Sequence, residues 1–73
     1  MIKYVVIANA STMPDTDYYF SGFSKDGSIV HLSRYFEEAK ISDLSSAQHN
    51  IAECRKLFGY CDNVVFCIEE VEL

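Results

Sequence analysis

Residues 18–32 read YYFSGFSKDGSIVHL, and this stretch decides the fold. Segments 18–23 and 28–32 are rich in aromatic and β-branched residues, which predicts two strands. Between them, Asp26 tolerates the left-handed backbone region and Gly27 enters it at no steric cost, so the pair predicts a tight β-hairpin. Gly22, inside the first of these strands, indicates a β-bulge or a close backbone approach.

Upstream of the hairpin, residues 2–8 read IKYVVIA and are apolar on both alternating faces. This pattern is typical of an inner strand that is covered on at least part of each side. Residues 9–17 follow, and their polar side chains together with Pro14 predict a loop in which Pro14 sets φ for a turn. This loop is longer than a tight hairpin needs.

Downstream of the hairpin, residues 33–42 form a connector with room for one helical turn around residues 35–39, and the main helix comes next. Its N-cap is Ser42 or Asp43, or else Ser45 in a capping box with Gln48. Gly59 predicts its end.

One face of this helix is apolar and falls in an arc of about 80°, which predicts that it packs on the sheet. Its residues are Leu44, Ala47, Ile51, Cys54 and Phe58. The opposite face is solvated and carries Ser45, Ser46, His49, Glu53 and Lys56.

The last strand, residues 63–73, opens with the apolar run VVFCI and changes the phase of its large side chains at Glu69 and Glu70. A β-bulge there would return Val71 and Leu73 to the face of the preceding apolar residues. The alternative is a strand that ends at Ile68 and continues as a tail. We favour the bulge.

These elements predict an α+β fold of order β-β-β-α-β, with a three- or four-stranded, mainly antiparallel sheet and one helix packed on one face. The direction of the last strand stays open. A chain of 73 residues has room for one domain, 1–73.

The net charge of the chain limits the kinds of partner that it can bind. Eleven acidic and six basic residues give a net charge of −5. Nucleic-acid binding and binding to anionic membranes both depend on clustered Lys and Arg, so both are disfavoured. No apolar run approaches the roughly 18 residues that span a bilayer. We expect a cytoplasmic protein that binds neither nucleic acid nor membrane.

No group of residues indicates catalysis. The odd cysteine count (Cys54, Cys61, Cys67) predicts reduced thiols, with Cys61 left open as exposed or reactive. Their spacing, with His49 nearby, lacks the close Cys-x2-Cys pair of zinc sites. Adjacent acids such as Glu69 and Glu70 point apart on a strand and form no acid–base pair. We expect no enzymatic activity, no metal and no cofactor.

The acidic surface is the remaining candidate. Neighbouring strand residues Tyr18 and Tyr19 point to opposite faces, which leaves one ring on the side away from the helix. Acids beside an exposed Tyr suit an interface with a basic protein surface, although charge also serves solubility. The predicted partner-binding residues are Asp15, Asp17, Tyr19, Asp26, Glu69, Glu70 and Glu72.

Four segments together carry a resemblance: 18–23, the Asp26-Gly27 pair, 39–47 and 64–73. In this pattern the chain resembles short phage and prophage proteins, among them inhibitors of host systems such as anti-CRISPR proteins. The resemblance implies a phage or mobile-element inhibitor that acts in the bacterial cytoplasm. It would dock an acidic surface on a basic, nucleic-acid-binding surface of a host defence nuclease complex.

Two other interpretations remain. The first is a self-associating structural or regulatory phage protein, a homodimer that pairs through an open sheet edge or face. The second is a metal or thiol protein built on the three cysteines and His49.

Overall fold

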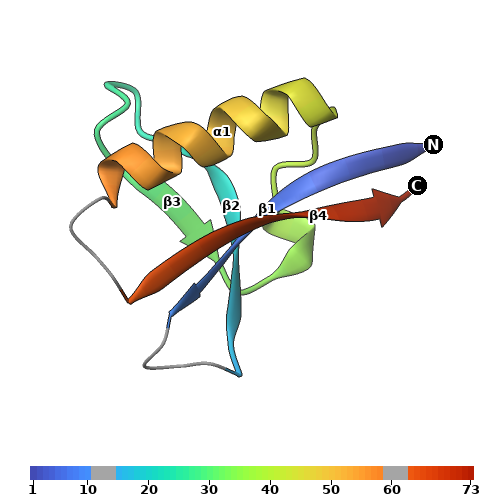
Figure 1. Cartoon of the computed structure of the whole chain (residues 1–73), viewed down its shortest axis with the longest axis horizontal. Helices are drawn as coiled ribbons and strands as arrows, with labels where there is room; N and C mark the ends of the chain where they lie inside the picture. The colour runs from blue at the N-terminus through green and yellow to red at the C-terminus, as the bar shows by residue number, and fades with distance from the viewer. Residues whose placement is uncertain (11–14, 59–62) are drawn as a thin grey trace.

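The computed structural model describes residues 1–10, 15–58 and 63–73. Its elements are β1 (Ile2–Ala10), β2 (Asp17–Phe23), β3 (Val30–Ser33), the 3-10 helix η1 (Phe36–Glu38), α1 (Leu44–Leu57) and β4 (Val64–Glu72). The strands form one antiparallel sheet of order β3-β2-β1-β4, and α1 contacts β1 and β4 (Figure 1). The predicted α+β class and element order are confirmed, with four strands and an antiparallel last strand.

β1 and β4 form a long two-stranded ribbon. They pair from Ile2 opposite Glu72 to Ala10 opposite Val64 without a shift in register. The bulge predicted at Glu69 and Glu70 is therefore wrong, and so is the alternative strand end at Ile68. The apolar side chains do change face at this point, because the sheet buries apolar residues on both sides and needs no extra residue to realign them.

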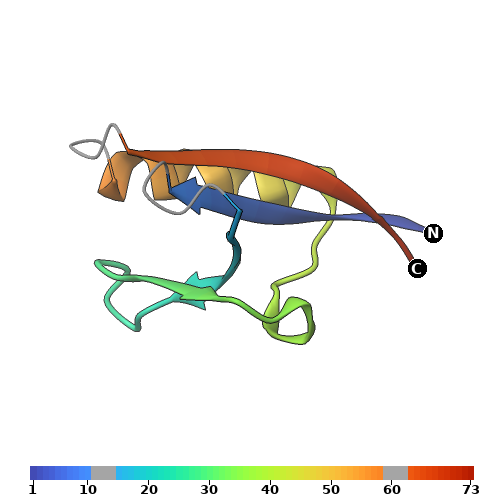
Figure 2. The same cartoon turned by 90° about the horizontal axis from the view of Figure 1, so that it is seen from below.

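The β2–β3 hairpin turns away from this ribbon, as the view in Figure 2 shows. β2 pairs with β1 only from Tyr19 opposite Ile7 to Asp17 opposite Asn9. The register between β2 and β3 shifts between Phe20 and Gly22, which confirms the predicted bulge.

The hairpin turn lies where the sequence predicts it, with Gly27 at φ 76°. β3 begins later than expected, at Val30 instead of residue 28. The reason is a wider loop, closed where the Ser24 N–H donates to the Ile29 carbonyl over 2.9 Å.

The connector takes the place that β2 leaves beside β1. The Tyr4 N–H donates to the Ser42 carbonyl over 2.9 Å, and the Ser42 N–H returns a bond of 3.0 Å to Tyr4. The Lys40 N–H donates to the Phe20 carbonyl over 2.8 Å. These bonds tie the connector to both β1 and β2. η1 confirms the predicted helical turn.

Asp43 is the N-cap of α1, and its carboxylate accepts the Ser46 N–H at 2.8 Å. Ser45 lies inside the helix, so the capping box predicted there is wrong. The predicted turn at Pro14 and helix end at Gly59 lie outside the described residues, as does Cys61.

The main core lies between α1 and the sheet. Phe20, 1 % exposed, is its largest fully buried side chain. The remaining members of the cluster are Val6, Ala8, Ala47, Ile51, Cys54 and Phe66. The predicted helix face is confirmed at its centre, whereas Leu44 at its start is 42 % exposed.

Apolar residues of β1 are buried on the other side of the sheet too. Val5 is 2 % exposed and Ile7 is 5 % exposed, although α1 lies on the opposite face. The prediction that this strand is covered on both sides is therefore confirmed. Among the described residues, no helix has the length and apolarity that crossing a bilayer requires.

Candidate functional site

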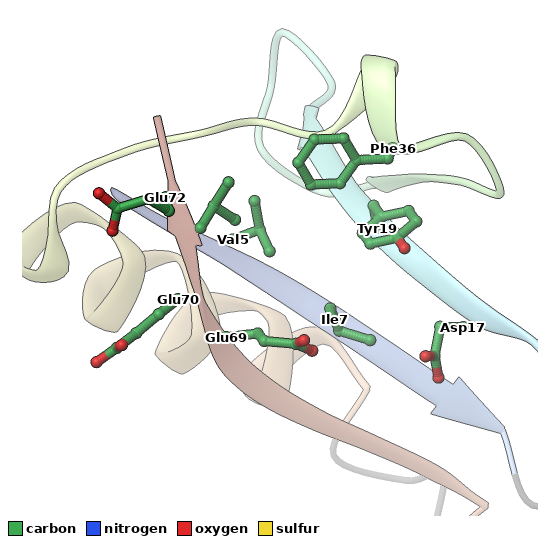
Figure 3. A pocket seen from close by; sticks show the side chains of 9 residues that line it. Val5, Ile7, Asp17, Tyr19, Phe36, Glu69, Glu70 and Glu72 are labelled. Atoms are coloured by element: carbon green, nitrogen blue, oxygen red, sulfur yellow. The ribbon is translucent and has the colours of Figure 1, made fainter. Parts of the chain in front are cut away.

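The face of the sheet away from α1 carries a hollow of about 410 Å³, which we call the sheet hollow (Figure 3). Val5 and Ile7 of β1 form its floor. Tyr19 of β2 and Phe36 of η1 stand on one side, and β4 borders the other. Its lining residues are Val5, Ile7, Asp17, Tyr19, Phe36, Glu69, Glu70, Val71 and Glu72.

Tyr19 and Phe36 form an aromatic wall. Their ring centroids lie 5.6 Å apart in an edge-to-face arrangement with an interplanar angle of 84°. Ser33 holds η1 in position, because its hydroxyl accepts the Tyr35 N–H at 3.1 Å and donates to Glu38 at 2.9 Å. The ring of Phe36 stays 42 % exposed, so the wall offers apolar surface to a partner.

The rim of the hollow is acidic. Figure 3 shows Asp17 and Glu69 on either side of Ile7, whereas Glu70 and Glu72 extend away on the other side of β4. The Asn9 amide donates to the Asp17 carboxylate over 3.0 Å and orients it. Of the four lining carboxylates, those of Asp17 and Glu69 flank Ile7, whereas Glu72 lies 3.8 Å from the N-terminal ammonium of Met1. A cationic group would therefore meet a favourable potential between Asp17 and Glu69.

Five of the seven predicted site residues lie together here. Asp17 and Tyr19 come from β2, while Glu69, Glu70 and Glu72 come from β4. β1 lies between the two strands and brings these distant segments together in one sheet.

The other two predicted residues lie elsewhere. Asp15 is exposed just before β2 and does not line the hollow. Asp26 lies in the hairpin turn, where its carboxylate accepts bonds from the Ser24 hydroxyl (2.6 Å), the Ser28 hydroxyl (2.8 Å) and the Ser28 N–H (3.1 Å). These bonds, the one from Ser24 first, lower the pKa of Asp26 to about 2. Asp26 thus stabilises its own turn.

Sequence reasoning missed Val5, Ile7 and Val71 as parts of this surface, although it gave Phe36 as a candidate for an exposed aromatic ring. A signal for all three was present. A first strand that is apolar on both faces needs a second apolar layer, and the phase change at residues 69–70 places Val71 in that layer. Nothing in the sequence signals that Phe36 packs on Tyr19, because this contact depends on the path of the connector.

The cysteines form no common site among the described residues. Cys54 is buried in the core, and burial first, then Glu53, raises its pKa to about 11. His49 is exposed on α1, away from it. Cys67 is exposed on β4, and its pKa is raised by partial burial and then by Glu69 and Asp17. In the described part of the chain, no three His, Cys, Asp or Glu residues are placed to hold a metal ion.

Comparison of the chain with protein-family models, curated proteins and solved structures gives no match in any of the three. The structure shows a small α+β fold with the order β-β-β-α-β, and no family is identified.

Proposed function

We propose that this chain is a non-enzymatic protein-binding module that docks the sheet hollow on a basic surface of another protein. The observation that supports this most is the joining of an exposed aromatic wall, an apolar floor and an acidic rim on one face. Protein interfaces commonly combine aromatic anchors with a polar rim. The acidic rim favours a cationic partner and speeds its association.

The more specific form of the proposal follows the resemblance to phage proteins. The module is then an inhibitor from a phage or mobile element that covers a nucleic-acid-binding surface of a host defence nuclease complex. Such surfaces are rich in Lys and Arg because they bind phosphates. A compact acidic domain with net charge −5 complements that charge.

Affinity capture from a bacterial lysate, followed by mass spectrometry, tests the proposal. Glu69→Lys reverses a charge on the rim, at an exposed residue whose side chain has no hydrogen bond or ion pair among the described residues. We expect this variant to bind the captured protein at least tenfold more weakly, because like charges oppose each other across the interface. Its melting temperature should match that of the unchanged protein.

Glu53→Lys is the control for net charge, because it brings the net charge from −5 to the same −3 at a site on α1, where it also removes the ion pair of Glu53 with Lys56 at 3.5 Å. It should retain the captured protein. Equal weakening by both variants would show that net charge acts without the hollow, and full retention by Glu69→Lys would overturn the proposal. A nuclease subunit in the captured set, with loss of its nucleic-acid binding, would support the inhibitor role.

Self-association is the second candidate, and one observation favours it. β4 lies at the edge of the sheet. Apolar side chains on this strand and directly after it are exposed, among them Val65 at 65 % and Leu73 at 63 %. Edge strands of this kind can pair with another chain. Sedimentation over a concentration series separates this candidate from a monomeric binding module.

A further inference from the structure

The outer edge of β4 presents free backbone groups. At its end, Leu73 and Met1 exchange two backbone bonds of 2.9 Å, so the backbone N–H and C=O groups of Leu73 point toward β1. The Phe66 carbonyl instead accepts a bond from Arg55 of α1 at 3.3 Å, so the backbone groups of Phe66 point to the outer edge of the sheet. Because the register is unbroken and antiparallel pairs alternate, Ile68, Glu70 and Glu72 also direct their N–H and C=O groups outward.

This open stretch is short and adjoins the hollow. No described strand pairs with the outer side of β4. Arg55 occupies the edge at Phe66, which leaves Ile68–Glu72 accessible. Glu69, Glu70, Val71 and Glu72 of this stretch also line the sheet hollow. One segment of a partner can therefore contact the edge and the hollow together.

We propose that the partner contributes a basic extended segment, which adds to the sheet as a fifth strand beside Ile68–Glu72. This rests on the proposed function and names the chemistry of the partner. Backbone bonds to Ile68, Glu70 and Glu72 supply affinity, and alternate side chains supply specificity. Lys or Arg side chains lie beside Glu70 and Glu72 on one face, and apolar side chains lie beside Val71 on the other.

A second copy of this chain fits the same edge poorly. Antiparallel self-pairing centred on residue 69 or 70 places a Glu directly opposite its own copy, and centring on residue 71 places Glu70 opposite Glu72. Parallel self-pairing in register brings each Glu beside its copy. Like charges opposite each other destabilise strand pairs. Registers nearer Phe66 displace Arg55 from its carbonyl bond. The charges therefore favour a basic strand of another protein.

Amide exchange measured by NMR on the whole chain tests the inference. The probe is the peptide acetyl-Lys-Val-Lys-Val-Lys-Val-amide, and its control has Glu in place of Lys. With the Lys peptide at saturation, exchange at the amides of Ile68, Glu70 and Glu72 should slow at least tenfold. The amides of Cys67, Glu69 and Val71 already pair with β1 and should change little. The Glu peptide should have no effect.

Two variants separate strand addition from simple charge attraction. Glu70→Ala removes one carboxylate, whereas Glu70→Pro removes the same carboxylate and the outward N–H. An edge strand tolerates proline where the N–H faces solvent, and NMR spectra verify the fold. We expect Glu70→Pro to bind the Lys peptide at least tenfold more weakly than Glu70→Ala. Equal binding by the two variants would overturn strand addition.

The remaining outcomes distinguish this inference from the proposed function. If the Lys peptide shifts the resonances of Tyr19 and Phe36 but leaves the edge amides exchanging as before, strand addition is wrong and the proposed docking surface stands. Equal binding of the Glu peptide, or no binding of the Lys peptide at millimolar concentration, would contradict the basic segment. Slow exchange at the same amides in a concentration-dependent dimer without peptide would identify a second copy as the occupant.

Discussion

Asp26 shows how a single residue can be predicted for one role and serve another. An acid in an exposed turn is a typical candidate for a binding residue, but the carboxylate of Asp26 accepts hydrogen bonds from Ser24 and Ser28. Both serines are close in sequence, so these bonds are local. Asx-type bonding of this kind is a reason why Asp is favoured in turns.

The pH dependence of the hairpin follows from these bonds. The pKa of Asp26 in the folded chain, about 2, lies below the ordinary 3.8. The ionised carboxylate therefore stabilises the turn above about pH 4, and this contribution is lost as the pH falls toward 2. NMR titration of the Asp26 carboxyl should give a midpoint near 2. Asp26→Asn should remove this pH dependence, and a midpoint near 3.8 would contradict the prediction.

At the scale of elements, β1 is covered on both faces, by a closed core on one and by a partly exposed layer on the other. On one face, Phe20 and α1 form the closed core. On the other face, Val5 and Ile7 are buried as well, but Tyr19 and Phe36 stay partly exposed and border the hollow. The first layer holds the fold together, and the second offers surface to a partner.

Two truncations compare the layers. Phe20→Ala should cost about 3–5 kcal/mol, which is a large fraction of the roughly 4–11 kcal/mol expected for a chain of this length. Phe36→Ala removes a half-exposed ring and should cost only about 1 kcal/mol. Urea denaturation measures both free energies of unfolding. Equal costs for the two substitutions would show that the layer of Tyr19 and Phe36 belongs to the folding core.

At the scale of the molecule, charge opposes self-association. Net charge is −5, and the open part of β4 carries Glu69, Glu70 and Glu72. Repulsion at such an edge is a known means of keeping edge strands unpaired.

Sedimentation should therefore find the unchanged protein monomeric at neutral pH and low salt. The double variant Glu69→Gln, Glu70→Gln keeps the size of these side chains and removes two charges. It should associate more strongly, because the repulsion across the edge is weaker. A micromolar dimer of the unchanged protein would contradict this prediction and would favour the self-associating interpretation.

The sequence by itself determined the local features of this protein. The turn at Gly27, the bulge at Gly22 and the buried helix positions Ala47, Ile51 and Cys54 were predictable. Each depends on residues only a few positions apart, through backbone preferences or helical periodicity.

Tertiary structure alone decided the register of β4 on β1 and the site that follows from it. The bulge predicted at Glu69 assumed that apolar residues belong on a single face, but Tyr19 and Phe36 cover the other face as well. Asp17 and Glu69 become neighbours of one hollow because β1 pairs with strands from both halves of the chain. Such pairings depend on contacts across dozens of residues, which no local pattern in the sequence records.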